Sequence, residues 1–178
     1  MIKYLTSSLL LFTIGLSSHL VSAAQKTSTT QTRYVCTPCG LACDKEVHTV
    51  PGICSGCKMK LVDRKTILHK TLSPVGLSKF IRSTPNLLIL DVRTKEEFDG
   101  QGVPDFGTIK NAVNVPISDI EKGAYKNLDK HKTILVYCSH SHRSSRVSYL
   151  LTQNGFTKIV NLSGGMSEVT DKSVLYSK

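Results

Sequence analysis

Three short apolar runs most strongly constrain how this chain can fold. They occupy residues 87–90, 134–137 and 159–162, and segments with helical spacing lie between them. Continuous apolar runs of this length are typical of strands that are buried on both faces. Strands that alternate with helices form a mainly parallel sheet covered by helices on both sides. The sequence therefore predicts an α/β domain from about residue 64 onward.

Several residues around these runs are helix start and stop signals. Ser73-Pro74 combines a cap residue with a first-turn proline, and Ser118 with Glu121 fits a capping box. Gly155 follows an apolar helical pattern and is expected to end that helix.

Cys138 directly follows the second apolar run and opens a polar loop that leads into a helix. The backbone N–H groups of such a loop and the positive end of the helix favour a negative sulfur over a neutral thiol. In parallel sheets the functional site forms beyond the carboxyl ends of the strands, where both Cys138 and Asp91 fall. We therefore predict a cysteine enzyme with Cys138 as nucleophile, against the alternative of an inert buried thiol. The residues expected to surround the sulfur and bind the substrate are Ser139, His140, Ser141, His142, Arg143 and Ser144.

From residue 87 onward the chain resembles the rhodanese (sulfurtransferase) domain family. The matching pieces, in the family's order, are Asp91-Val92-Arg93, Glu97-Phe98, residues 107–116, the Cys138 loop with Arg143-Ser144, and residues 154–165. The resemblance implies a rhodanese-like parallel sheet flanked by helices. It also implies a cysteine that takes sulfur from a donor such as thiosulfate, becomes a persulfide and passes the sulfur to cyanide or a thiol. Catalysis of this kind needs no cofactor. The implied partners are small sulfur-containing anions, thiols and a protein thiol acceptor.

The length of the Cys138 loop separates reactions within this fold. Cys138 and Arg143 enclose four residues, which resembles sulfurtransferases. Phosphatases and arsenate reductases of the same fold have one more residue, so phosphate chemistry is the weaker interpretation. Arg143 is expected to anchor the loop and attract an anionic donor, and Asp91 and Arg93 to hold the loop by hydrogen bonds and ion pairing.

His140 and His142 allow two interpretations: they add positive charge beside the thiol, or they are exposed loop residues without an essential role. Three positions depart from the family pattern. Thr108 stands where the family often has histidine, Ser141 where many members have glycine, and Val169 near the place of a closing aromatic. Ser141 is the departure expected to matter, because losing a glycine constrains the loop's backbone.

Residues 34–62 form a cysteine-dense module with two CxxC pairs separated by fourteen residues. Four thiolates at this spacing are typical of a tetrahedral zinc ribbon. The predicted metal ligands are Cys36, Cys39, Cys54 and Cys57. Cys43 is interpreted as a spare thiol and His48 as a solvated loop residue, although either could supplement a ligand. The module also resembles the small heavy-metal-binding domain found beside metal-efflux proteins, which commonly has histidine where Cys39 stands.

Disulfides are the alternative to a metal in this module. Closely spaced CxxC pairs chelate metals readily, and five cysteines is an odd number, so we expect metal. Zinc is the default structural ion, and copper(I) also suits soft sulfur ligands.

The first 24 residues have the pattern of a cleaved signal peptide. Lys3 supplies a positive start, an apolar stretch follows, and residues 21–24 are small. Ser and His interrupt that stretch, so no stable membrane span is expected. Residues 25–33 are polar and are expected to form a linker. These features predict a periplasmic or secreted protein.

The formal net charge of +10 is spread along the chain without a concentrated basic run. A nucleic-acid partner is therefore not expected, whereas small anions are. Two function hypotheses follow. The first is an exported sulfurtransferase, with residues 64–178 as its rhodanese domain and the ribbon as a metal-binding module. The second is a metal- or persulfide-binding sensor with little turnover.

Overall fold

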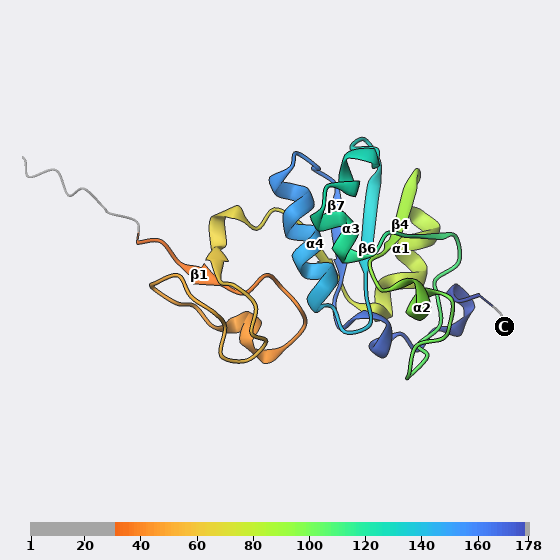
Figure 1. The fold of residues 1–178 in the computed structure, drawn as a ribbon, viewed down its shortest axis with the longest axis horizontal. Helices are drawn as coiled ribbons and strands as arrows, with labels where there is room; N and C mark the ends of the chain where they lie inside the picture. The colour runs from red at the N-terminus through yellow and green to blue at the C-terminus, as the bar shows by residue number, and fades with distance from the viewer. Residues whose placement is uncertain (1–30, 177–178) are drawn as a thin grey trace, which may run out of the picture. The chain divides into compact units, whose positions relative to one another are not determined.

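The computed structural model describes residues 31–176. The predicted signal peptide and most of the predicted linker lie outside these residues. A five-stranded sheet forms the centre of the α/β domain, and all of its strand pairs are parallel (Figure 1). In spatial order its strands are β3 (Lys70–Leu72), β7 (Ile159–Leu162), β6 (Thr133–Tyr137), β4 (Leu87–Asp91) and β5 (Ala112–Asn114). The predicted α/β class is confirmed.

The two faces of this sheet carry separate hydrophobic clusters, because side chains alternate along each strand. Helix α1 (Leu77–Ser83) packs with Ile89 and Leu135 on one face. Helices α3 (Ile117–Glu121) and α4 (His142–Gln153) pack with Leu90 and Val136 on the other. Burial on both faces explains why β4 is apolar up to Asp91 and why β6 is apolar after Thr133.

The helix boundaries correct one expectation from the sequence. Ser118 lies inside α3, whose N-cap is Pro116, so the predicted capping box at Ser118 and Glu121 is wrong. A capping box is present instead at helix α2 (Lys95–Phe98), where Thr94 and Glu97 exchange hydrogen bonds.

The other two predicted helix termini, one start and one end, agree better with the structure. The Ser73-Pro74 pair opens a short 3-10 turn, η3 (Pro74–Gly76), which leads into α1, although the Ser73 side chain makes no capping bond. Gly155 has a φ of +84° just after the C-cap of α4 and ends that helix as predicted.

The cysteine-dense module is closed by a short antiparallel pair, β1 (Tyr34–Val35) with β2 (Val62–Asp63). Its small core consists mainly of cysteines with Met59 and Leu61. The remaining 3-10 turns are η1 (Ala42–Lys45), η2 (Arg64–Thr66), η4 (Ala124–Asn127), η5 (Gly165–Glu168) and η6 (Lys172–Val174).

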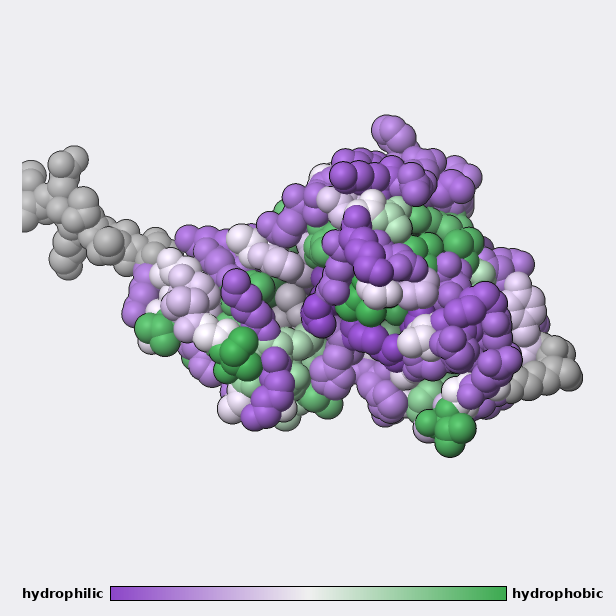
Figure 2. Space-filling model, in the orientation of Figure 1, coloured by the Kyte–Doolittle hydropathy of each residue, from purple (hydrophilic) through white to green (hydrophobic). Residues whose placement is uncertain are grey.

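The visible face of the molecule is mostly hydrophilic, with apolar surface confined to small separate patches (Figure 2). Within residues 31–176, no helix has the length and apolar character needed to cross a membrane.

We predict that acid lowers the stability of the folded protein, because His69 is buried. It is 7% exposed, neither ring nitrogen has a hydrogen-bond partner within residues 31–176, and burial lowers its pKa from 6.5 to about 4. A base whose pKa is lower in the folded state loses folded-state stability as it protonates. The free energy of unfolding should therefore fall between pH 6.5 and pH 4, by up to about 3 kcal/mol from this group.

Urea unfolding of the wild type and His69→Phe at pH 7, 5.5 and 4.5 measures this contribution. The stability of the variant should depend less steeply on pH, since contributions shared with the wild type cancel in the comparison. Parallel pH curves would contradict the prediction.

Candidate functional site

Cys138 lies at the carboxyl end of β6 and is 1% exposed. Its Sγ accepts a hydrogen bond from the Ser144 backbone N–H at 3.4 Å, across the first turn of α4. The carbonyls of Cys138 and Ser139 accept backbone hydrogen bonds from Met166 and Ser167, both at 2.9 Å. With its carbonyls engaged by η5, the loop can present N–H groups to the sulfur.

Gly165 allows this close approach of η5 to the loop. It has a φ of +67°, and a Cβ built there would lie 2.5 Å from the Cys138 carbonyl oxygen and 2.6 Å from that of Ser139. No side chain fits in that space, so only glycine lets η5 reach the loop.

Ser141 adopts the left-handed conformation that glycine would favour, with a φ of +67°. Two hydrogen bonds hold it there: its Oγ accepts from Asn161 Nδ2 at 2.9 Å, and its carbonyl accepts from Ser144 Oγ at 3.2 Å. The backbone at position 141 is therefore constrained as expected, and these two hydrogen bonds stabilise the left-handed conformation of the serine.

Asn161 is a site residue that the sequence analysis missed. It is fully buried in β7, and its Nδ2 also donates to the Pro38 carbonyl at 3.0 Å. One amide thus joins the cysteine module to the Cys138 loop. A polar residue inside the apolar run at 159–162 was the signal that could have identified it.

Glu97 fixes the Cys138 loop from α2. Its carboxylate accepts from Arg143 Nη1 at 2.6 Å, from Arg143 Nη2 at 2.7 Å and from Ser139 Oγ at 2.7 Å. Chiefly because of the Arg143 hydrogen bonds, the pKa of Glu97 is lowered from 4.5 to about 2. The stabilisation from this pair is present above pH 4.5 and is lost as pH falls towards 2. Arg143 therefore anchors the loop as expected. Its partner is Glu97, to which the sequence analysis gave no role.

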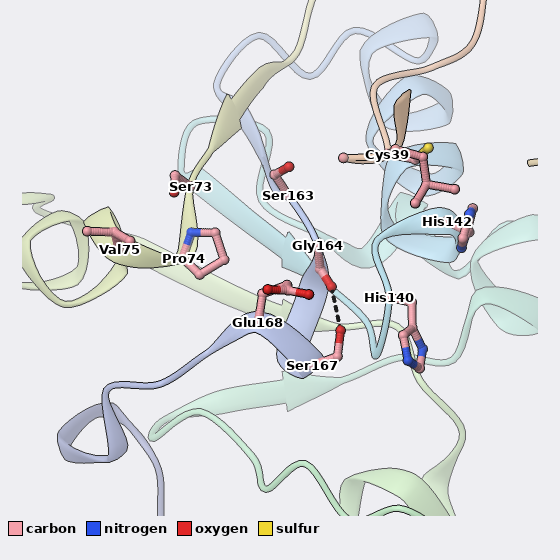
Figure 3. A pocket seen from close by; sticks show the side chains of 12 residues that line it. Cys39, Ser73, Pro74, Val75, His140, His142, Ser163, Gly164, Ser167 and Glu168 are labelled. Atoms are coloured by element: carbon pink, nitrogen blue, oxygen red, sulfur yellow. Dashed lines mark hydrogen bonds between the residues drawn. The ribbon is translucent and has the colours of Figure 1, made fainter. Parts of the chain in front are cut away.

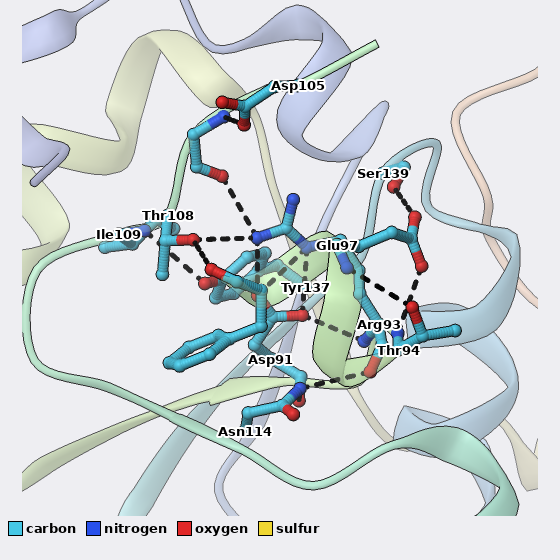
Figure 4. Close-up of polar contacts among 12 residues, drawn as sticks. Asp91, Arg93, Thr94, Glu97, Asp105, Thr108, Ile109, Asn114, Tyr137 and Ser139 are labelled. Atoms are coloured by element: carbon cyan, nitrogen blue, oxygen red, sulfur yellow. Dashed lines mark hydrogen bonds and ion pairs between the residues drawn. The ribbon is translucent and has the colours of Figure 1, made fainter. Parts of the chain in front are cut away.

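Asp91 and Arg93 form a bidentate ion pair that is almost fully buried (Figure 4). Arg93 Nη2 lies 2.7 Å from Asp91 Oδ2 and also donates to the Gly107 carbonyl and to Thr108 Oγ1. Thr108, at a position where the resembled family often has histidine, thus continues the hydrogen-bond network to the Phe98 carbonyl. The pair reaches the Cys138 loop through Tyr137, whose ring lies under the Arg93 guanidinium.

His140 and His142 lie on the opposite side of a cavity from Ser73 and Pro74 (Figure 3). The cavity has a volume of about 720 Å³, and Cys39 of the module also lines it. His140 is exposed and packs edge-on against Phe106, with ring centroids 5.3 Å apart, whereas His142 is half-buried.

Four cysteines of the module converge on one point, but they differ from the expected set in one member. The four sulfurs within 4.8 Å of one another belong to Cys36, Cys43, Cys54 and Cys57. Cys43, expected to be a spare thiol, thus takes the place of Cys39.

Contacts with Asp44 explain why Cys39 lies outside the four-cysteine group. The Asp44 carboxylate accepts the backbone N–H groups of Cys39 and Gly40, and the Cys39 thiol donates to Asp44 Oδ1 at 3.3 Å. This turn holds Cys39 away from the other three knuckle cysteines. Cys39, Cys43 and Asp44 form a second, smaller group of possible ligands. His48 lies outside both groups and contacts Glu46.

The four-cysteine group fits a tetrahedral ion. Metal–sulfur bonds of about 2.3 Å place sulfurs about 3.8 Å apart. The Cys36 and Cys57 sulfurs lie 3.5 Å apart, and Cys36, Cys43 and Cys54 are buried. All six cysteines are free thiols, so the disulfide alternative has no counterpart in this structure.

Comparisons with known proteins agree on the family. The model of the rhodanese-like domain matches residues 74–172. "Uncharacterized protein YqhL" of Bacillus subtilis is 36% identical over 80 residues, which cover 45% of this chain and 58% of the relative. "Putative sulfur carrier protein YrkF" of the same organism is 30% identical over 93 residues, covering 52% of this chain and 46% of the relative. The chain thus spans about half the length of the curated relatives that it matches.

Solved structures show the same fold. A rhodanese-like domain protein from Staphylococcus aureus is 27% identical, with a TM-score of 0.50 over 61% of this chain and 99% of its own. Protein SSP1007 from Staphylococcus saprophyticus is 26% identical, with a TM-score of 0.50 over 60% of this chain and 99% of its own. With a cysteine loop at the end of a central parallel strand and a family match over more than half of its length, the chain belongs to the rhodanese-like domain family.

Proposed function

We propose that the protein is a sulfurtransferase that carries sulfane sulfur on Cys138. The Cys138 thiolate attacks the outer sulfur of a donor such as thiosulfate, and the sulfur–sulfur bond of the donor breaks. Sulfite leaves with the bonding electron pair, and Cys138 becomes a persulfide. The lone pair of an acceptor, cyanide or a thiolate, then attacks the outer sulfur and restores the Cys138 thiolate. Both steps are displacements at sulfur and need no oxidant or reductant.

The observation that carries this proposal is the Ser144 N–H directed at the Cys138 sulfur from the first turn of α4. An N–H donor and a helix N-terminus stabilise the anionic sulfur before attack and after transfer. The loop has the four-residue length of sulfurtransferases, and the Bacillus subtilis relative named "Putative sulfur carrier protein YrkF" supports the same chemistry.

Mass spectrometry of the protein after incubation with thiosulfate tests the proposal. We expect a gain of one sulfur atom, located on the peptide that contains Cys138, and its loss as thiocyanate when cyanide is added. A protein that gains no sulfur from thiosulfate or from an organic persulfide, or gains it only on the module cysteines, would contradict the assignment.

The proposal includes a structural zinc ion held by Cys36, Cys43, Cys54 and Cys57, with copper(I) as the alternative for an all-sulfur site. The ion would stabilise a module whose apolar core is too small to fold alone. Catalysis at Cys138 does not involve it.

The ligand set predicts different effects for two cysteines of the same module. Cys43→Ser should lower bound zinc to well below one ion per chain, because it removes one of the four converging sulfurs. Cys39→Ser should retain one ion, because Cys39 lies outside that group. Elemental analysis with a count of free thiols measures both variants. Zinc lost from Cys39→Ser and kept by Cys43→Ser would contradict this ligand set.

Export to the periplasm or beyond the cell is also part of the proposal and rests on the sequence of residues 1–24. N-terminal sequencing of protein from fractionated cells tests it: a mature end near residue 25 is expected, and an intact Met1 in the cytoplasmic fraction would refute it.

The sensor hypothesis is a second candidate, favoured by the Asn161 amide that joins Pro38 of the module to Ser141 of the loop. A sensor would turn over slowly with every thiol acceptor and would change its persulfide lifetime with the metal state. An enzyme would turn over rapidly with at least one physiological thiol, so turnover across a panel of thiols separates the two.

A further inference from the structure

A second cavity, of about 350 Å³, lies between the second cysteine pair of the module and the start of α4. It is lined by Cys57, Lys58, Met59, Lys60, His142, Arg143 and Arg146. Four of these seven residues are permanent cations at neutral pH, and none is acidic. Two segments more than 80 residues apart in sequence thus build one basic cavity.

The four cations of this cavity are not equally available. Arg143 is paired with Glu97 at 2.6 Å, and Arg146 is paired with Glu121. Lys58 and Lys60 are exposed and make no ion pair within residues 31–176. Among the four cations, the two without a carboxylate partner within residues 31–176 therefore belong to the module.

The backbone at Lys58 shows that the turn itself does not require a lysine. Its N–H donates to the Cys54 carbonyl at 3.1 Å, and its φ is +61°. A left-handed conformation is less favourable for a lysine than for a glycine, because the Cβ crowds the backbone there. The turn would be more stable with glycine, so the reason for a lysine lies in its side chain.

The cavity adjoins the reactive sulfur through Arg143. This residue lines the cavity, and its pKa is raised first by Glu97 and further by the charge of Cys138. An anion in the cavity would therefore lie beside the same arginine that interacts with the Cys138 sulfur.

We propose that Lys58 and Lys60 are specificity-determining residues, which bind the oxyanion group of an anionic sulfur donor beside the Cys138 loop. The module is then part of the donor site as well as a metal-binding unit. This inference rests on the proposed sulfur transfer and names the residues that select its donor. Thiosulfate is the simplest such donor, and the cavity also has room for a small organic thiosulfonate.

Steady-state kinetics with thiosulfate as the varied donor and saturating cyanide test the proposal. The test variant is Lys58→Gly with Lys60→Gln, in which glycine suits the turn. The control is Lys45→Gln, which removes a lysine of the same module that does not line the cavity. We expect the KM for thiosulfate to rise about 10-fold in the double variant, with kcat within about two-fold of the wild type, because two positive charges that attract the anion are lost. The KM of the wild type should also rise more steeply with salt than that of the variant.

A binding measurement keeps this test separate from the test of sulfur transfer. Titration of the ¹⁵N-labelled holoprotein with sulfate, an unreactive mimic, should shift the amides of residues 57–60 and 142–146 in the wild type, and only weakly in the double variant. If these shifts occur without any thiocyanate formation, the sulfurtransferase proposal fails and the anion site stands. If KM and the sulfate shifts are unchanged in the double variant, the anion site is overturned. The anion site would also be overturned if the double variant lost zinc but kept the wild-type KM for thiosulfate. The two lysines would then serve only to offset the negative charge of the metal-bound thiolates.

Discussion

Cys138→Ser is expected to reduce thiocyanate formation from thiosulfate and cyanide by at least about 10³-fold, to the background rate. A serine hydroxyl is protonated at neutral pH, is a poor nucleophile towards sulfur and cannot hold a persulfide. The fold should persist, because the substitution changes one buried atom and should alter the free energy of unfolding by no more than about 1–2 kcal/mol. Initial rates and urea unfolding curves of the same preparations measure both effects.

Ser148→Ala is a suitable control for this variant. Ser148 lies on the buried side of α4, and its Oγ has no hydrogen-bond partner within residues 31–176. Losing that hydroxyl should leave the rate near that of the wild type. Residual transfer in folded Cys138→Ser above a few per cent would show that another thiol carries the sulfur.

Arg93→Met is expected to destabilise the fold by about 3–5 kcal/mol. The substitution leaves the Asp91 carboxylate buried without its guanidinium partner and removes the hydrogen bonds to Gly107 and Thr108. Because the network ends at Tyr137, next to Cys138, transfer activity should fall as well. Urea unfolding at pH 7 measures the loss of stability.

The double variant Asp91→Leu/Arg93→Met provides the matched comparison. Replacing both charges removes the uncompensated carboxylate, so the double variant should be more stable than Arg93→Met alone. Equal stability of the single and double variants would mean that the ion pair is not the source of the effect. A loss below about 1 kcal/mol in Arg93→Met would mean that water reaches Asp91.

The centre of the fold was predictable because its signals are local. The runs that became β4, β6 and β7 are apolar at nearly every position, which follows from burial on both faces. Two strands were not recognised as such: β3 and β5 are three residues long, lie at the sheet edges and are partly polar. Their strand state comes from pairing with neighbours and not from their own composition.

The residues around Cys138 were predictable only in part. The loop itself is contiguous in sequence, and its thiol position follows from the end of a strand. Glu97 and Asn161 reach the loop from other elements, more than 40 and about 20 residues away from their contacts. Their roles depend on which segments the sheet order brings together.

The sequence alone determined the parallel α/β domain, the place of Cys138 at the end of a buried strand and the presence of a cysteine-dense module. These conclusions depend on contiguous patterns, which local backbone preferences and burial translate directly into structure. Only the tertiary structure decided which four cysteines converge, since spacing pairs Cys36 with Cys39 whereas the Asp44 turn diverts Cys39 and brings Cys43 inward. The same holds for the basic cavity of Lys58, Lys60 and α4. Contacts between distant segments arise from packing of the whole chain, and no local pattern encodes them.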